Sequence, residues 1–413
     1  MAGLLLQFLL LVPVFLCVQA QSSYNLADSL LLPVTKHGAS LQYLTKIHHG
    51  NGLVPTELVL DLGGPFLWMD SVSSSGSLIS SGSIQCLAAK SMFGDDDHGR
   101  SKSFLEICKI FPENRITQMG NQGELVDDTF FIQSKSSGSV ISVSQSFLFG
   151  SAPISLLNGL ATGAQGMLGL GRHRISLPSQ ISAAFDSKWQ FSLCLSSSNG
   201  ILVFENRLSK SYFGPELSQS LIYTPLLKTQ LADTSNHEYF INLQSIRING
   251  KTLSLEKGLG GSKLSTIVPY TTMESSIFAV FSKAYEKAAM AMNMKKVKSV
   301  APFGLCFSSE GIQETLLGPE VPAIDLVLQS KMVKWRIYGR NSMVMVSNEI
   351  MCLGFLDGGS DLKSSITLGG YQLEDILLHL DVGASMLGFS PSLLLKQRSC
   401  SDFELVTMSK ESL

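Results

Sequence analysis

Short apolar runs recur along the whole chain, and Gly, Ser, Pro or Asn residues bound most of them. Many of these runs are rich in β-branched and aromatic residues, which favour strands. Helical spacing is strong from Glu274 to Met292, and a shorter helix is predicted from Pro178. The pattern predicts an all-β protein of sandwich or barrel type with a few helices. The clearest predicted strands are Leu58–Leu62, Thr129–Gln133, Val140–Leu148, Phe191–Leu195, Ile201–Glu205 and Tyr239–Ile248.

The two halves of the chain echo each other. In each half an apolar strand runs into an unusual turn, at Leu60–Gly64 and at Thr266–Thr271. Later in each half comes an apolar segment with glycine at its end, Gly166–Gly171 and Ile366–Gly370. A chain of 413 residues, 45% of them apolar, is too long for one ordinary core. We therefore predict two lobes, at 21–220 and 221–413.

The first residues have the features of a secretory signal peptide. Met1–Ala20 carries an apolar run without acidic or basic side chains, and Val18-Gln19-Ala20 is an acceptable cleavage site. The run is short for a membrane span, although an uncleaved anchor is the alternative. We predict a signal peptide at 1–20, a mature chain from Gln21, a secreted location and no membrane span.

Charge and cysteine content exclude several classes of function. Charged residues make up 15% and the net charge is -2, so no basic field exists to hold nucleic acid or an acidic membrane. One of the seven cysteines, Cys17, lies in the signal. The even number that remains fits three disulfides in an oxidising compartment, with buried free thiols as the alternative. The Ser-rich stretch Ser71–Ser83 predicts a mobile surface loop.

No metal or cofactor motif is complete. His48-His49 lacks a third ligand, and the acidic run within Gly94–Gly99 lacks the alternating spacing of a calcium loop. Gly166–Gly171 lacks the βαβ unit of a dinucleotide site, which favours close strand packing instead. A Gly-x-Ser-x-Gly elbow is absent as well. We predict no cofactor and no metal.

Asp61 is the candidate catalytic residue. It ends an apolar strand and is followed closely by Gly63 and Gly64. In pepsin-like proteases an Asp-Thr-Gly or Asp-Ser-Gly motif does this once per lobe, and the two carboxyls share a proton. One carboxyl activates water and the other polarises the peptide carbonyl. Here Leu62, which follows Asp61, has no polar side-chain atom.

The second half supplies no partner for Asp61. We predict that Val268 stands where the second aspartate would be, followed by Pro269, so this position is not acidic. The nearest acid, Glu274, is better interpreted as a favourable charge at a helix N-terminus. The candidate flap hairpin, Ile116–Leu125, contains no aromatic residue. Asp61 is therefore predicted to be a vestigial catalytic residue held by local N–H groups.

Several sequence blocks together resemble the plant xylanase/endoglucanase-inhibitor group of pepsin-like proteins. This group includes the wheat xylanase inhibitors, the carrot extracellular dermal glycoprotein and the basic 7S globulins. The matching blocks are Asp61–Gly64, Phe66–Trp68, Phe111–Asn114, Ala152-Pro153, Gly169–Gln180, Tyr223–Leu227, Ser265–Thr271, Ala301–Phe307, Ile324–Ser330, Cys352–Phe355 and Gly369–Asp375.

The resemblance implies a bilobal pepsin-like fold without proteolytic activity. It also implies the disulfides Cys306–Cys352 and Cys194–Cys400, which leaves Cys86–Cys108 as the remaining pair. Some members bind and block microbial cell-wall glycanases, so the implied partners are microbial glycoside hydrolases and the implied location is the apoplast or cell wall. We expect a monomer. Candidate inhibitory loops lie near Asp361–Ser364 and at Lys396–Ser399.

The chain departs from the family in its first lobe, which is normally rich in cysteine. Ser71–Ser83 and Asp95–Ser103 contain none, and Ser151 stands where a cysteine is usual. Lost cross-links are expected to soften this lobe. Two alternatives to a glycanase inhibitor remain open at this point. One is an active aspartic endopeptidase, and the other is a storage or peptide-binding globulin.

Overall fold

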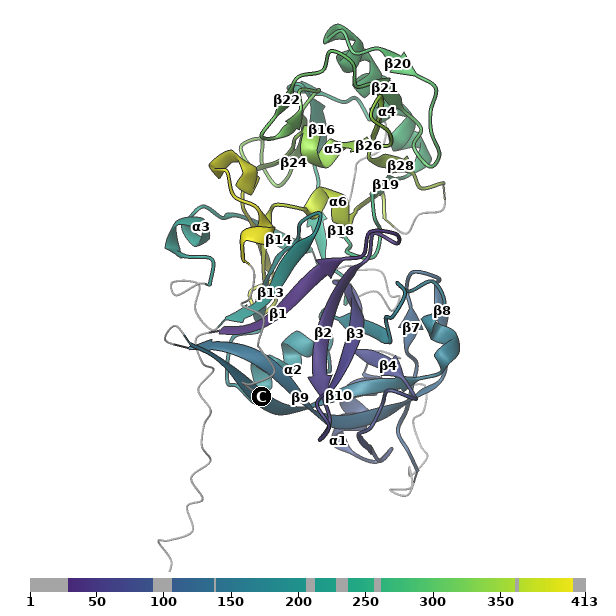
Figure 1. Cartoon of the computed structure of the whole chain (residues 1–413), viewed down its shortest axis with the longest axis vertical. Helices are drawn as coiled ribbons and strands as arrows, with labels where there is room; N and C mark the ends of the chain where they lie inside the picture. Colours follow the sequence, from purple (N-terminus) through teal and green to yellow (C-terminus); the bar gives the residue numbers. More distant parts are fainter. Residues whose placement is uncertain are drawn as a thin grey trace, which may run out of the picture.

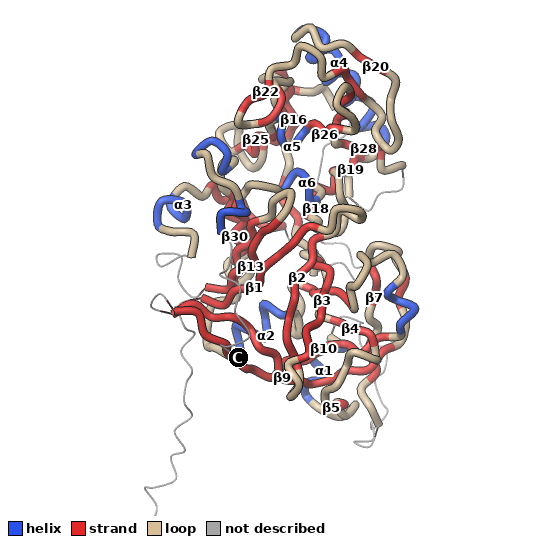
Figure 2. Tube along the Cα trace, viewed as in Figure 1, coloured by secondary structure: helices blue, strands red, loops and turns tan. Residues whose placement is uncertain are grey.

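The computed structural model describes residues 29–91, 106–136, 139–205, 212–227, 237–255, 261–360 and 364–403. Two lobes are stacked along the longest axis of the molecule (Figure 1). Strands dominate both lobes and the helices are few, as Figure 2 shows. This confirms the predicted all-β, bilobal class. The predicted signal peptide at 1–20 and the acidic run within Gly94–Gly99 lie outside the described residues.

The N-terminal lobe holds the long antiparallel hairpin β9–β10, which closes the lower part of the molecule in Figure 1. Phe130 of β9 packs against Phe147 and Phe149 of β10, with ring centroids 5.5 and 5.7 Å apart. The elements of this part are β1 (Ser29–Lys36), β2 (Tyr43–His49), β3 (Val54–Asp61), β4 (Trp68–Asp70), β5 (Ser77–Leu78), α1 (Ile84–Lys90), β6 (Lys109–Ile110), β7 (Glu113–Asn114), β8 (Met119–Gly120), β9 (Gly123–Ser136), β10 (Ser139–Ala152), a 3-10 turn (Ile154–Leu157), β11 (Gly166–Gly169), α2 (Leu177–Ala184), β12 (Gln190–Cys194), β13 (Asn199–Glu205) and α3 (Pro215–Gln219).

The C-terminal lobe contains the longest helix of the described residues, α4 (Ser275–Ala291), which the sequence pattern predicted. Glu274 caps this helix by accepting from the N–H groups of Ser276 and Ile277. The other elements are β14 (Ile222–Leu227), β15 (Phe240–Asn242), β16 (Ser245–Ile248), β17 (Lys251–Thr252), β18 (Gly261–Leu264), β19 (Thr271–Met273), β20 (Lys296–Val297), β21 (Cys306–Ser308), β22 (Glu314–Thr315), β23 (Gly318–Pro319), β24 (Ile324–Val327), β25 (Lys334–Ile337), α5 (Gly339–Ser342), β26 (Met343–Met345), β27 (Ile350–Leu353), β28 (Phe355–Asp357), β29 (Ile366–Leu368), α6 (Gly370–Leu373), β30 (Leu377–Asp381), β31 (Met386–Phe389) and two 3-10 turns (Leu393–Lys396 and Cys400–Phe403).

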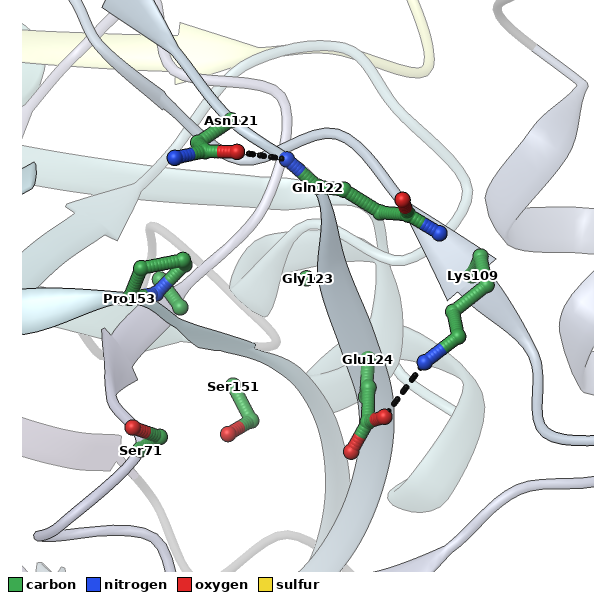
Figure 3. A pocket seen from close by; sticks show the side chains of 9 residues that line it. Ser71, Lys109, Asn121, Gln122, Gly123, Glu124, Ser151 and Pro153 are labelled. Carbon is green, nitrogen blue, oxygen red and sulfur yellow. Dashed lines mark hydrogen bonds and ion pairs between the residues drawn. The ribbon is translucent and has the colours of Figure 1, made fainter.

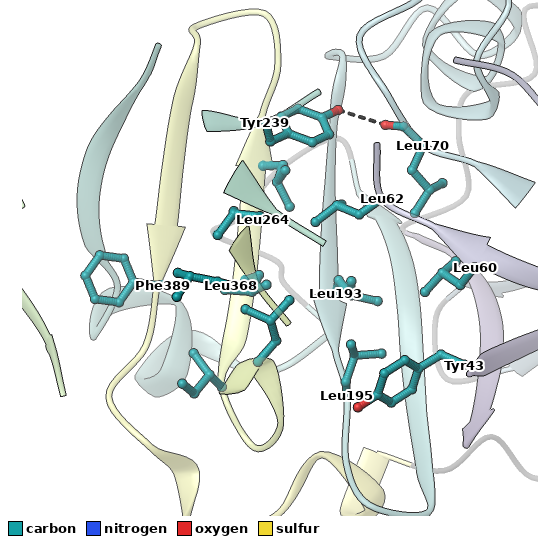
Figure 4. Packing of buried hydrophobic residues seen from close by; sticks show 14 of the residues in the cluster. Tyr43, Leu60, Leu62, Leu170, Leu193, Leu195, Tyr239, Leu264, Leu368 and Phe389 are labelled. Carbon is teal, nitrogen blue, oxygen red and sulfur yellow. Dashed lines mark hydrogen bonds between the residues drawn. The ribbon is translucent and has the colours of Figure 1, made fainter. Parts of the chain in front are cut away.

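The two lobes share one sheet and one core. Near the end of the chain, β30 pairs with β12 of the N-terminal lobe, and β31 pairs with β30 and with β14 of the C-terminal lobe. Leu60 and Leu170 of the first lobe belong to the same buried cluster as Leu368 of the second (Figure 4). The Tyr239 hydroxyl donates to the Leu170 carbonyl at 2.8 Å. Because apolar burial is the main stabilising force, the lobes are joined by their core as well as by the chain.

Three disulfides are present: Cys86–Cys108, Cys194–Cys400 and Cys306–Cys352. These are the pairs that the family resemblance implies. Cys194–Cys400 joins residues that are 206 positions apart in the sequence, and so holds the last 3-10 turn against β12.

The predicted mobile loop Ser71–Ser83 is more structured than its composition suggested. The Asp70 carboxylate accepts from the backbone N–H groups of Val72 and Ser73. Ser83 caps α1 by accepting from the Cys86 N–H. Short polar side chains form such local hydrogen bonds readily, and composition alone does not reveal them.

Candidate functional site

The turn that follows β3 holds Asp61 in a buried position. Its carboxylate Oδ1 accepts from the Gly63 N–H at 3.0 Å. Its carbonyl accepts from the N–H groups of Gly64 and Leu170 at 3.1 and 3.0 Å. A Cβ atom on Gly64 would lie 2.8 Å from Asp61 Oδ2 and 3.0 Å from the Gly169 Cα. The second glycine is therefore required for the chain to turn this closely around the carboxylate.

Strand register identifies the equivalent turn in the other lobe. Leu60 lies opposite Leu168 in the parallel pair β3–β11, and Leu264 lies opposite Leu368 in the parallel pair β18–β29. The residue after Leu60 is Asp61, and the residue after Leu264 is Ser265. The place of the second aspartate is therefore occupied by Ser265.

Our prediction that Val268 occupies this place was wrong by three residues. A Cβ on Gly169 would meet the Gly64 carbonyl oxygen at 2.7 Å, and one on Gly369 would meet the Val268 carbonyl oxygen at 2.8 Å. Val268 is thus the counterpart of Gly64. The prediction failed because a run of apolar residues does not reveal strand register, which is set by inter-strand hydrogen bonds. Neither Ser265 nor Val268 nor Pro269 carries a carboxylate.

The two turns are joined by the hydroxyl of Thr266 in the second lobe, and no equivalent hydroxyl comes from the first lobe. Thr266 Oγ1 donates to the Leu60 carbonyl at 2.6 Å and accepts from the Leu62 N–H at 3.0 Å. Leu62 occupies the corresponding position in the first lobe, but its side chain is buried in the core and has no hydroxyl to return the contact. The turns are therefore held together by the hydrogen bonds of one threonine hydroxyl, where a hydroxyl residue at position 62 would have added a second set.

The guanidinium of Arg115 lies directly against the Asp61 carboxylate. Its Nη1 donates to Asp61 Oδ1 at 2.9 Å and to Oδ2 at 3.2 Å. Its Nη2 donates to Glu238 Oε1 of the second lobe, which also accepts from Lys263 Nζ at 3.2 Å. The side chains of Asp61, Arg115 and Glu238 are 3%, 13% and 9% exposed, so the network is largely withdrawn from water.

The hairpin that carries Arg115 begins earlier than the predicted flap at Ile116–Leu125. It consists of β7 and β8, and Arg115 is the first residue of its turn. Asn114 shapes this turn, because its side chain accepts from the Ile116 N–H and donates to the Leu156 carbonyl. Arg115 was not predicted as a site residue, although it directly follows the Phe111–Asn114 block.

This arrangement lacks the elements of aspartic-protease chemistry. That reaction requires two facing carboxyls that share one proton. Here a serine, Ser265, holds the place equivalent to that of Asp61, and the Arg115 guanidinium lies between Asp61 and the nearby acid Glu238. The guanidinium serves as the hydrogen-bond donor to both carboxylates.

Other side chains that the sequence singled out have structural contacts. His49 is fully buried between Asp128 Oδ2 and Thr56 Oγ1, each at 3.0 Å. Among the described residues, no group of three or more His, Cys, Asp or Glu is placed to hold a metal ion. Gly169 lets β11 approach the Phe66 backbone closely, since a Cβ would lie 2.4 Å from the Phe66 carbonyl oxygen.

A second buried ion pair also joins the lobes. Lys36 Nζ donates to Glu374 Oε1, which in addition accepts from the Tyr43 hydroxyl at 2.8 Å. Burial raises the pKa of both Glu374 and Tyr43. The Lys36 ammonium and the Tyr43 hydroxyl both donate to Glu374 Oε1, so the pair has the character of a structural contact between lobes.

A pocket of about 630 Å³ lies where β6 pairs with the first residues of β9 (Figure 3). Polar side chains surround it, and its two charged groups, Lys109 and Glu124, form an ion pair with each other. Ser151, which stands where a family cysteine is expected, is part of its wall. Ser71, the first residue of the cysteine-free stretch Ser71–Ser83, also lines it.

The chain matches two family models, described as Xylanase inhibitor N-terminal (residues 43–205) and Xylanase inhibitor C-terminal (residues 238–391). It is 40% identical over 423 residues to "Probable aspartic proteinase GIP2" of Nicotiana benthamiana, covering 95% of each chain. It is 37% identical over 402 residues to "Gamma conglutin 1" of Prunus dulcis, covering 92% of this chain and 91% of that one.

Solved structures agree with these matches. The fold superimposes on the crystal structure of edgp with a TM-score of 0.83 at 40% identity, covering 93% of this chain and 99% of that one. It superimposes on basic 7S globulin from soybean with a TM-score of 0.78 at 30% identity, covering 92% and 100%. The chain therefore belongs to the xylanase-inhibitor family of pepsin-like proteins.

Proposed function

We propose that this protein is a secreted, non-proteolytic binding protein that inhibits microbial cell-wall glycanases. The observation that supports this most directly is the Asp61 site, where a serine holds the place of the second aspartate and Arg115 is bonded to the Asp61 carboxylate. A site of this kind provides neither the shared proton nor the water-activating base of a protease. Without this chemistry, we expect the protein to act by binding a partner through its surface. The family is named for xylanase inhibition, which suggests a glycanase as that partner.

The segment Lys396–Ser399 is the candidate inhibitory loop within the described residues. It begins at Lys396, the last residue of a 3-10 turn, and Gln397 adopts a left-handed conformation with φ 54°. Lys396 forms a surface ion pair with Glu216, and Leu395 beside it is half exposed. Glycoside hydrolases carry paired carboxylates in their clefts, which a cationic loop would complement. Of the other candidate loop, 361–363 lie outside the described residues and Ser364 is buried.

The proposed location is the apoplast or cell wall. Three disulfides suit an oxidising compartment, and the first 20 residues have the features of a signal peptide. Within the described ranges, no helix has both the length and the apolar character needed to cross a bilayer.

The test is an inhibition assay with the mature chain and a panel of fungal xylanases and endoglucanases from several families. We expect tight, saturable inhibition of at least one enzyme, reduced roughly tenfold or more by Lys396→Ala if the loop lies at the centre of the interface. Lys331→Ala, on a separate surface turn, is the matched control. Full activity of every enzyme in the presence of the protein would refute the proposal.

Two other functions are suggested by the names of relatives. One relative is named a probable aspartic proteinase. Because Asp61 is bonded to Arg115 and lacks a second aspartate, we predict that this protein does not cleave a denatured protein at acid pH. Others are named gamma conglutin and basic 7S globulin. Seed-restricted abundance or saturable peptide binding, together with no glycanase inhibition, would favour a storage or peptide-binding role.

A further inference from the structure

We propose that Asp61 and Glu238 form a guanidinium-binding site and that Arg115 is its built-in ligand. The two carboxylates come from different lobes, Asp61 from the end of β3 and Glu238 from just before β15. Each accepts from a different terminal nitrogen of the same guanidinium. A planar group with several fixed donors can satisfy two carboxylates at once, which a lysine ammonium does less well.

The steric fit of the site supports this assignment. A Cβ atom on Gly63 would lie 2.7 Å from Arg115 Nη1 and 3.3 Å from Nη2. The guanidinium thus lies directly on the Asp61 turn, where a larger residue at position 63 would displace it. Lys263 completes the charge balance, because two carboxylates then face two cations.

The site connects three parts of the molecule that are far apart in sequence. Arg115 is 54 residues from Asp61 and 123 residues from Glu238. The guanidinium therefore ties the β7–β8 hairpin of the first lobe to the Asp61 turn and to the second lobe. While Arg115 is bound, the hairpin is held down. When the hairpin moves away, the carboxylate pair is free to take an arginine side chain from a peptide or protein partner.

The experiment removes the built-in ligand and supplies it from solution. In Arg115→Ala, backbone amides of residues 113–120 should exchange with deuterium roughly tenfold faster than in the unmodified chain, because the hairpin loses its anchor. Millimolar methylguanidine should stabilise this variant against thermal unfolding, whereas methylammonium at the same concentration should not. The double variant Asp61→Asn/Arg115→Ala should lose the response to methylguanidine.

Controls make the outcomes decisive. Arg174→Ala removes an exposed arginine outside the network and should neither speed exchange in the hairpin nor create a methylguanidine response. If Arg115→Ala does not fold, Arg115→Gln is used for the same two measurements. An equal response to methylguanidine and methylammonium, or a response that survives Asp61→Asn, would overturn the proposal. None of these readouts depends on glycanase inhibition, so the binding site and the proposed function can fail separately.

Discussion

The two turns that face each other at the centre of the molecule have the same backbone frame and different chemistry. The turn after β3 carries Asp61 and two glycines, and the turn after β18 carries Ser265, Val268 and Pro269. Both are supported by a parallel strand with a glycine at or just after its end, Gly169 in β11 and Gly369 after β29. The frame survives because it is built from backbone hydrogen bonds and close packing, which do not depend on whether a carboxylate is present.

The difference between the turns follows from what each one must accommodate. Gly64 lies against the Asp61 carboxylate and has no room for a side chain. At the corresponding place, Val268 is tolerated beside Ser265, whose hydroxyl accepts from the Val268 N–H at 3.3 Å. The turn without an acid therefore has room for a side chain at position 268. In the other turn the acid is present and is bonded to a cation.

The largest expected effect comes from removing that cation. Arg115→Ala should lower the free energy of unfolding by about 3–5 kcal/mol, because two buried carboxylates then lose their shared partner. Urea unfolding followed by tryptophan fluorescence measures this, with Arg174→Ala as the control. A loss below about 1 kcal/mol would show that the pairing resembles a surface ion pair instead.

The supporting glycines test whether the two frames are equivalent. Gly169→Ala and Gly369→Ala should each cost about 1–3 kcal/mol, because the new Cβ would lie 2.4 and 2.5 Å from backbone atoms of Phe66 and Tyr270. Gly38→Ala, where no atom lies within 4 Å, is the neutral control. Strongly unequal costs in thermal or urea unfolding would break the comparison between the lobes.

A smaller effect is expected from the hydroxyl that joins the turns. Thr266→Val keeps the shape of the side chain and removes both of its hydrogen bonds, leaving the Leu62 N–H without this acceptor. The expected cost is about 1–3 kcal/mol, toward the lower end if water replaces the hydroxyl. Chemical denaturation measures it, and Thr272→Val, a neighbouring half-buried threonine in β19, is the matched control.

The smallest effect should come from the serine at the position of the lost acid. Ser265→Ala removes one weak hydrogen bond to the Val268 N–H and should cost about 0.5–1 kcal/mol. If Ser265→Ala destabilised the protein as much as Arg115→Ala, the two turns would contribute equally, contrary to the comparison. Unfolding curves for the two variants under identical conditions decide this.

Sequence reasoning succeeded where the determining interactions are local. The helix from Glu274 was predicted from its apolar spacing, with Glu274 as a favourable charge at its N-terminus, because these signals act within a few residues. The strands around Leu58–Leu62 and Phe191–Leu195 were predicted from their apolar and β-branched character. Asp61 was recognised because its motif is contiguous. The position of its counterpart was missed because that position depends on strand register.

The amino-acid sequence by itself determined that this chain folds as strands with few helices and has no acid in the second turn. Only the tertiary structure decided that Ser265 is the counterpart of Asp61 and that Arg115 joins Asp61 to Glu238. The reason is physical: hydrophobic pattern and turn chemistry are encoded by near neighbours, whereas a salt bridge between residues more than 50 positions apart exists only after the sheets have paired.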